Sequence, residues 1–134
     1  MNISILYGGA STEHKISIQT GLAVADAVKD RYKLDLINLE AEIYNSPHLL
    51  LDTDLVFNAL HGGEGENGSI QAFLDLHHIP YTGSGSKACK IAMDKNITKL
   101  IAKSVYIPTP NWILFNYFYF EATSWNDHFF LPTG

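Results

Sequence analysis

The sequence predicts an α/β fold of three layers, in which a parallel sheet carries helices on both of its faces. Short apolar runs alternate with segments of helical period from residue 2 to about residue 105. The first and third of these runs lead directly into glycine-rich stretches, as strands that turn sharply do. Ligands of such folds bind beyond the carboxyl ends of the strands, so these two loops are the first candidates for a site.

The first half of the chain gives three strands and one helix. Residues 2–9 are expected to form a buried strand that turns at two glycines, and residues 32–39 and 54–61 two more strands. A helix is expected over residues 12–29, with Ser11 as its N-cap and Glu13 in its first turn. Its inner face is predicted from helical spacing to hold Ile18, Gly21, Leu22, Ala25 and Val28.

The second half gives short helices joined by brief extended segments. A helix after the glycine-rich loop would place Ile70, Phe73, Leu74 and His77 on one face. Residues 79–83 are expected to add a fourth strand that Gly83 closes, and residues 84–93 a short helix. Asp94 can cap the next helix, whose common face is predicted to hold Ile97, Leu100, Ile101 and Ser104. The prolines of residues 107–110 would end it, before a strand over 111–116.

Composition excludes several classes of function. A net charge of −5 without a basic run argues against nucleic acid or an anionic membrane as the main partner. No apolar stretch reaches transmembrane length, and the first residues lack the pattern of a signal peptide. The single cysteine, Cys89, cannot form an internal disulfide and is expected to be a small buried apolar residue. These features favour a cytoplasmic protein of one core.

The glycine-rich loop "LHGGEGENGSIQ", residues 60–71, has three alternative interpretations. Gly63, Gly65 and Gly68 fit the GxGxxG spacing of a dinucleotide site. Against that, Glu64 and Glu66 would lie beside the pyrophosphate, and no acid follows about 20 residues later to hold a ribose. The loop could instead be a tight turn that needs positive φ, or a site for a ligand other than phosphate.

Four motifs together suggest a family. The segments "LYGGASTEHKIS", "VFNALHGGEGENGSIQAFLD", "IPYTGSG" and "AMDKNITK" resemble the amino-terminal part of D-alanine–D-alanine ligases, from residue 2 to about residue 114. These ligases belong to the ATP-grasp superfamily and join two D-alanines for peptidoglycan synthesis through an acyl phosphate made from ATP. The resemblance implies a Rossmann-like pre-ATP-grasp substrate domain over residues 1–83. The start of an incomplete, ATP-binding ATP-grasp domain would follow over 84–134.

The resemblance also implies roles for individual residues. Glu13 matches the family glutamate that orients the first D-alanine and its ammonium group, which makes it the candidate catalytic residue. Ile16 matches an apolar residue that packs on the substrate methyl group, and His61 a histidine near the substrate carboxylate, with Gly62 allowing close approach of the backbone. Lys95 matches a lysine that contacts ATP phosphates.

Each of these residues also has an ordinary structural explanation. Glu13 suits a first helical turn, and His61 could be a hydrogen-bonded residue that ends a strand. Lys95 could be an exposed lysine whose charge Asp94 offsets. Ser17 stays undecided between a site residue and a buried helix hydroxyl. Three other histidines, His14, His77 and His78, do not form a convincing metal set.

The sequence departs from the family pattern at two places. Asn67 stands where many members have an aspartate, which removes a charge from the loop. From Tyr117 onward the aromatic-rich sequence no longer follows the family, and the expected second ATP-binding lysine and the ligands for Mg²⁺ or Mn²⁺ are not found. We therefore expect that this chain alone does not ligate. The alternative is a non-catalytic module that binds an amino acid or a partner, and the family implies a homodimer.

Overall fold

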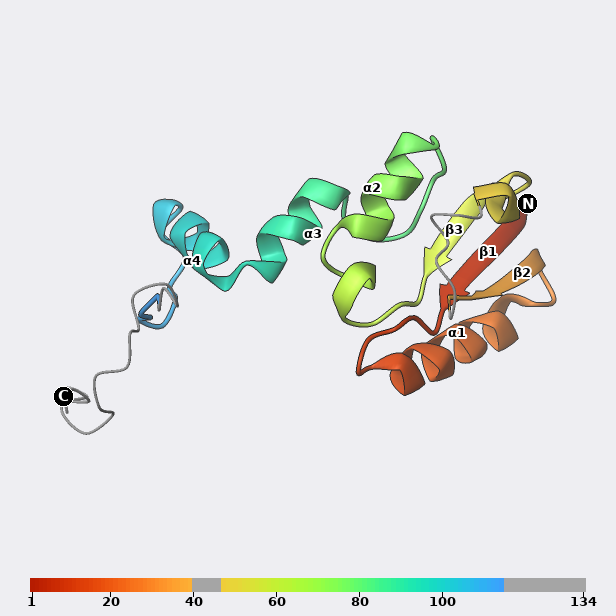
Figure 1. Cartoon of the computed structure of the whole chain (residues 1–134), viewed down its shortest axis with the longest axis horizontal. Helices are drawn as coiled ribbons and strands as arrows, with labels where there is room; N and C mark the ends of the chain where they lie inside the picture. Colours follow the sequence, from red (N-terminus) through yellow and green to blue (C-terminus); the bar gives the residue numbers. More distant parts are fainter. Residues whose placement is uncertain (40–46, 115–134) are drawn as a thin grey trace.

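The computed structural model describes residues 1–39 and 47–114, and it shows the predicted alternation of strands and helices (Figure 1). The first part consists of β1 (Asn2–Tyr7), α1 (His14–Val28) and β2 (Lys33–Asn38). A short 3-10 helix, η2 (Pro47–Leu50), and β3 (Leu55–Asn58) come next, and a second one, η3 (Gly63–Gly65), lies in the glycine-rich loop. The last elements are α2 (Ser69–Leu76), α3 (Ser86–Met93) and α4 (Lys95–Ser104).

The three strands form a parallel sheet in the order β2-β1-β3. Ile3 of β1 pairs with Leu34 of β2 on one side and with Leu55 of β3 on the other. The central place of β1 follows from its sequence, because the four residues Ile3 to Leu6 are all buried and leave no face for solvent. The predicted parallel α/β fold is confirmed.

Both faces of the sheet carry a hydrophobic core, which gives three layers. On one face, Ile3 and Ile5 pack with Ala25 of α1 and with Ala59. On the other, Leu6 joins the cluster of Leu50, Val56, Leu60, Ile70 and Leu74, to which α2 and η2 contribute. Figure 1 shows α1 and α2 on opposite sides of the strands. The alternation of side chains along β1 thus builds two cores from one strand.

The buried face of α1 differs from the prediction. It consists of Ser17, Gly21 and Ala25, spaced four residues apart, whereas Leu22 is 49% exposed. A Cβ atom on Gly21 would lie 2.6 Å from the Cβ of Tyr7, so the helix and β1 approach too closely for a larger side chain. Helical spacing predicted Gly21 and Ala25 correctly but also placed Leu22 on this face, whereas close packing on the strand selects small residues.

The predicted fourth strand over residues 79–83 is wrong in its extent. Tyr81 forms one isolated bridge with Val56, whose N–H donates to the Pro80 carbonyl at 2.8 Å and whose carbonyl accepts from Thr82 at 3.0 Å. Pro80 has no N–H to extend the ladder, and Gly83 turns the chain away with φ +102°. The predicted strand over 111–116 is also absent from its described part, residues 111–114, and its last two residues lie outside the described ranges.

Tyr81 also ties this segment to α2, and this contact predicts a pH dependence. Its hydroxyl donates to Asp75 at 2.8 Å, and burial, with the hydrogen bond to Asp75 and its charge, raises the pKa of Tyr81. Because folding favours the protonated phenol, this contribution is complete below the ordinary value near 10 and is lost as the pH rises through the raised pKa.

We expect Tyr81→Phe to lower the free energy of unfolding by about 1 kcal/mol at pH 7 and by less as the pH exceeds about 10. Urea unfolding of both proteins across this range measures the difference. Tyr106→Phe is the matched control, since Tyr106 is 94% exposed. If the difference in unfolding free energy between wild type and Tyr81→Phe stayed constant with pH, it would contradict the raised pKa of Tyr81.

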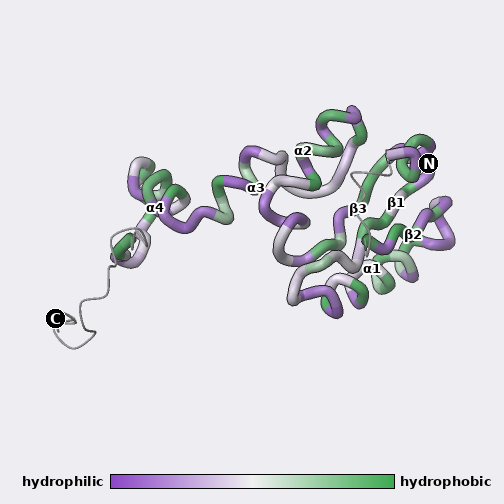
Figure 2. Tube along the Cα trace, viewed as in Figure 1, coloured by the Kyte–Doolittle hydropathy of each residue, from purple (hydrophilic) through white to green (hydrophobic). Residues whose placement is uncertain are grey.

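Helices α3 and α4 extend away from the sheet (Figure 1). Asp94 caps α4 as predicted, because its side chain accepts from the Ile97 N–H at 3.0 Å. The expected apolar face of α4 exists, but Ile97, Leu100 and Ile101 are each between 41% and 52% exposed in the described structure. Figure 2 shows the alternation of polar and apolar residues along this helix. The face predicted from the sequence is therefore real, but the described residues cover only about half of it.

The polar side of α4 receives the segment that follows it. Trp112 donates its indole N–H to Asn96 at 2.8 Å, and the ammonium groups of Lys99 and Lys103 lie 5.4 and 5.5 Å from its ring centroid.

Cys89 of α3 is only partly buried, contrary to expectation, and its thiol lies 3.3 Å from the Ser84 carbonyl. Among the described helices, none is long and apolar enough to cross a membrane.

Candidate functional site

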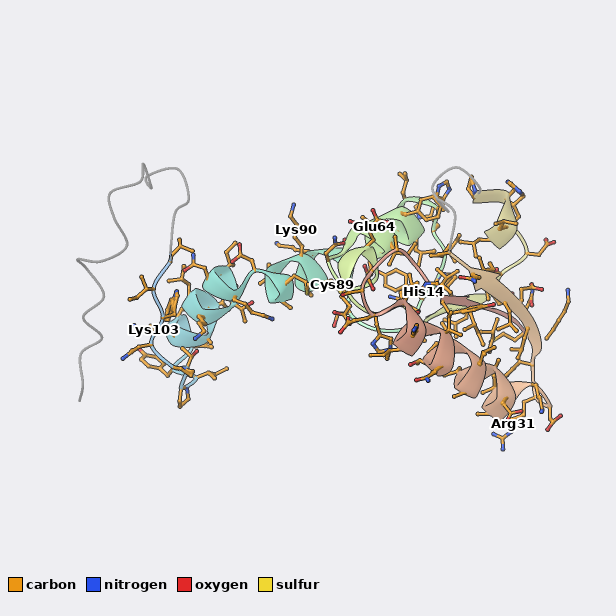
Figure 3. The ribbon with its side chains drawn as sticks, turned by 60° about the horizontal axis from the view of Figure 1, so that its bottom comes forward. His14, Arg31, Glu64, Cys89, Lys90 and Lys103 are labelled. Carbon is orange, nitrogen blue, oxygen red and sulfur yellow. The ribbon has the colours of Figure 1, made fainter. Side chains whose placement is uncertain are left out.

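Two loops meet at the carboxyl ends of β1 and β3. One runs from Gly8 to Glu13 and leads into α1, and the other, the glycine-rich loop, runs from Ala59 to Gly68 and leads into α2. Because β1 and β3 are adjacent parallel strands, both loops leave the same edge of the sheet. Figure 3 shows His14, at the start of α1, and Glu64, in the glycine-rich loop, in the middle of the molecule, on the side of the sheet towards Cys89.

Ser11 joins the two loops directly. Its hydroxyl donates to the His61 carbonyl at 2.5 Å and accepts from the Glu13 N–H at 3.1 Å. The residue therefore does not cap α1 in the predicted way. It fixes the backbone on either side of the candidate site, and His14 secures the same turn through Nδ1, which donates to the Gly9 carbonyl at 2.7 Å.

Ser17 makes a second link beneath the first. It is fully buried, its hydroxyl donates to the Ala59 carbonyl at 2.8 Å, and it accepts from the Gly8 N–H at 2.8 Å. One side chain thus connects α1 to the residues that directly follow two strands. Left undecided from the sequence, Ser17 is a structural bridge that sets the spacing of the two loops.

Glu13 and Gly62 lie against each other across this junction. Glu13 is the last residue before α1, not a first-turn residue as expected, and its side chain is exposed. A Cβ atom on Gly62 would lie 2.7 Å from the Oε2 atom of Glu13, and Gly62 has φ +65°. The absence of a side chain at Gly62 is what leaves room for the carboxylate.

This contact predicts that Gly62→Ala costs stability and moves Glu13. The backbone of Gly62, at φ +65° and ψ 176°, is almost confined to glycine and would cost alanine about 1–3 kcal/mol, and the added methyl group must also displace the carboxylate. Gly83→Ala is the matched control, because Gly83 has φ +102° but a Cβ atom there would meet nothing within 4 Å. Thermal or urea unfolding of both variants should show the larger loss for Gly62→Ala, and equal losses would contradict the contact.

His61 lies between the loops and α1. Its backbone carbonyl is held by Ser11, and its Nε2 atom is 3.1 Å from the hydroxyl of Thr20. Ile16, one turn earlier on α1, is 50% exposed. The structure thus brings Glu13, His61 and Gly62 together at one junction, with Ile16 on the adjoining helix.

The glycine-rich loop uses its own backbone N–H groups internally. The N–H groups of Gly65, Glu66 and Asn67 donate to carbonyls within the loop at 3.0–3.2 Å, and that of Ser69 donates to the Asn67 side chain at 2.9 Å. The Gly65 carbonyl accepts from Asn58 at 2.9 Å and from Gln71 at 2.8 Å. A dinucleotide site needs free N–H groups here, so this arrangement disfavours that alternative.

The glycines themselves meet a steric demand. Gly62, Gly63 and Gly68 have φ between +48° and +94°, as the tight-turn interpretation predicted. Gly65 is needed for a different reason, because a Cβ atom there would lie 2.3 Å from that of Leu60. Asn67, the departure from the family pattern, has a clear local task in ordering the start of α2.

Lys95 stands apart from this junction. It is the first residue of α4, and its ammonium group lies 3.4 Å from the Ala92 carbonyl. Figure 1 places α4 at the far end of the molecule from α1. Within the ranges that the structure covers, no group of three histidine, cysteine, aspartate or glutamate side chains could hold a metal ion.

Comparisons with known proteins agree with this geometry. The family model described as "D-ala D-ala ligase N-terminus" matches residues 38–84, which include the whole glycine-rich loop. The D-alanine--D-alanine ligase of Coprothermobacter proteolyticus is 41% identical over 114 residues, and that of Aquifex aeolicus 44% identical over 121. The chain matches the amino-terminal part of the D-alanine–D-alanine ligase family.

Solved structures of these ligases share the fold. That of the Bacillus anthracis enzyme superposes with a TM-score of 0.78 at 38% identity and covers 84% of this chain. A second structure of the Bacillus anthracis ligase, complexed with ATP, gives 0.77 at 39% identity. The chain spans 38% and 40% of the lengths of the Coprothermobacter and Aquifex ligases and 37% of the Bacillus anthracis chain.

Several residues that build this junction were not singled out from the sequence. Ser11 was expected only as a helix cap, and Thr20, Asn58 and Gln71 were not considered. Each of them acts by a hydrogen bond to a residue distant in sequence or across a loop, and such pairing leaves no periodic signal. A polar residue on the inner side of a helix was the one available sign, and it applied to Ser17 of α1 and to Gln71 of α2.

Proposed function

We propose that this chain forms the first-substrate half of an ATP-dependent ligase that joins two D-alanines through a D-alanyl phosphate for peptidoglycan synthesis. The observation that carries the proposal is the junction of Glu13, Gly62 and His61, which two loops build at the carboxyl edge of the sheet. The similarity of the chain to D-alanine–D-alanine ligases supports the same function.

The junction has polar groups that suit a small amino acid. The exposed carboxylate of Glu13 is a partner for an ammonium group, and the imidazole of His61 is a second polar group of the same junction. Gly62 presents bare backbone between them, and the exposed side chain of Ile16 can cover a methyl group. Together these four residues suit D-alanine better than a phosphate ester, because two of the nearby loop residues, Glu64 and Glu66, are acids.

For the nucleotide, we assign Lys95 a contact with ATP phosphates. A cation at the first position of a helix opposes the helix dipole, and a phosphate beside it would remove this conflict. Residues 84–134 would then begin the ATP-binding domain, and residues 1–83 form the substrate domain. In the ligase, Mg²⁺ or Mn²⁺ would stabilise the transferred phosphoryl group. The described residues do not fit either ion, and none is given a role in holding it.

The same proposal places the protein in the cytoplasm as a homodimer, with D-alanine and ATP as its small-molecule partners. Residues 1–134 alone are expected to bind D-alanine without releasing ADP. The competing possibility is a non-catalytic module that binds an amino acid or a partner protein. The two differ in whether Glu13 and His61 decide what is bound.

The test is a titration of the purified chain with D-alanine and with L-alanine, followed by NMR chemical shifts. D-Alanine is expected to bind more tightly, and His61→Ala to weaken it by roughly fivefold to tenfold. A parallel assay with Mg²⁺, ATP and D-alanine measures ADP. Equal binding of both enantiomers, or binding that ignores His61→Ala, would overturn the substrate assignment and favour the module.

A further inference from the structure

The hydroxyl of Thr20 lies between two groups whose hydrogen-bonding roles differ. It is 3.0 Å from the Ile16 carbonyl, one turn earlier in α1, and 3.1 Å from Nε2 of His61 in the glycine-rich loop. This side chain is a direct contact between α1 and the imidazole ring. The site residues proposed above do not include it.

The single hydrogen of the hydroxyl decides the arrangement. The Ile16 carbonyl can only accept, and a threonine within a helix commonly donates to the carbonyl four residues earlier. Because that hydrogen is donated to the Ile16 carbonyl, the hydroxyl oxygen of Thr20 can only accept a hydrogen bond from the His61 ring. Nε2 of His61 must then carry a hydrogen and donate it to Thr20.

We propose that Thr20 is a positioning residue that holds His61 as the Nε2–H tautomer. The neutral ring then has its lone pair on Nδ1, to which no described residue forms a hydrogen bond. This proposal rests on the function proposed above and refines it. A neutral His61 accepts a hydrogen bond from a ligand N–H, such as the ammonium group of D-alanine, and only the protonated ring can donate to a carboxylate.

The preference for an ammonium group agrees with the position of Glu13. Its carboxylate beside Gly62 also accepts and never donates when ionised. Two acceptors from two loops would then hold one cationic group. The resemblance to the ligase family implied instead that His61 lies near the substrate carboxylate. A hydrogen on Nε2 supports the contact with the ammonium group, whereas a hydrogen on Nδ1 would support the contact with the carboxylate.

The experiment reads the tautomer directly, without ligand. Long-range ¹H–¹⁵N correlation spectra of the labelled full chain, recorded at a pH where imidazole is neutral, give different shifts for a protonated and a bare ring nitrogen. Wild type and Thr20→Ser are expected to show a protonated Nε2 and a bare Nδ1. Thr20→Val keeps the shape of the side chain but removes the hydroxyl, and is expected to give a mixture of tautomers.

Titration with D-alanine completes the test. Thr20→Val should weaken binding about fivefold, and Thr20→Ser should restore it to within about twofold of wild type. A hydrogen on Nδ1 in wild type, or an unchanged tautomer in Thr20→Val, would overturn the positioning role. If the tautomer responds as expected but D-alanine does not bind to any of the three proteins, the positioning role stands and the proposed substrate is wrong.

Discussion

Replacing Ser17 with alanine is expected to lower the free energy of unfolding by about 2–4 kcal/mol, because two buried backbone groups lose their partner. The Gly8 N–H and the Ala59 carbonyl both bond to this hydroxyl at 2.8 Å, in a place without solvent access. Alanine fits the space but offers neither a donor nor an acceptor. Urea unfolding of both proteins, followed by circular dichroism, measures the loss.

The matched control is Ser104→Ala at the end of α4. Its hydroxyl donates to the Ile101 carbonyl at 2.7 Å but is exposed, so water can replace it. We expect a change below about 0.5 kcal/mol there. A loss of similar size for both variants would show that the hydrogen bonds of Ser17 are not what holds the loops. Hydrogen exchange at Gly8 would also report whether the loops separate.

Replacing Glu13 with glutamine is expected to weaken D-alanine binding roughly tenfold to hundredfold, with little effect on folding. The amide keeps the size of the side chain and its fit beside Gly62, but it removes the negative charge that would hold the ammonium group. Because Glu13 is exposed and its backbone N–H is already held by Ser11, the loop should keep its conformation. NMR titration with D-alanine and a thermal unfolding curve measure both effects.

Glu66→Gln provides the control, since Glu66 is an acid of the neighbouring loop. It changes the net charge by the same amount without touching the proposed site. Equal weakening by both variants would mean that general electrostatic attraction, not a specific contact of Glu13, draws the ligand. Unchanged D-alanine binding by the Glu13→Gln variant would show that the charge of Glu13 does not hold the ligand.

The fold could be predicted largely because its signals are local. Apolar runs such as residues 2–7 give buried strands, and Asp94 precedes α4 as an N-cap does. The predictions were wrong where packing against a residue distant in sequence decides which side chains are buried. The inner face of α1 was predicted to include Leu22 beside Gly21 and Ala25, because nothing local reveals how near Tyr7 lies to Gly21.

The candidate site was predictable only in part, for the same reason. The two loops could be placed at one edge of the sheet from the order of strands, and the resemblance to a family supplied Glu13, Ile16, His61 and Gly62. The roles of Ser11, Ser17 and Thr20 depend on partners about 40–50 residues away, and no spacing rule relates such positions. The contact of Lys95 with ATP phosphates stays a prediction.

The side-chain hydrogen bonds that hold the two loops in place share a property that matters for their variation. Ser11, Ser17, Asn58 and Gln71 all donate to main-chain carbonyls, which every amino acid possesses. An accepting residue can therefore change its side chain without losing this hydrogen bond, except at Gly65, where a Cβ atom would meet Leu60. His61 is an example, since alanine there would keep the bond from Ser11 while removing only the imidazole. These hydrogen bonds thus hold the backbone of the junction independently of the side chains that would contact a ligand. Those side chains, and with them the ligand preference, could change while the backbone stays the same.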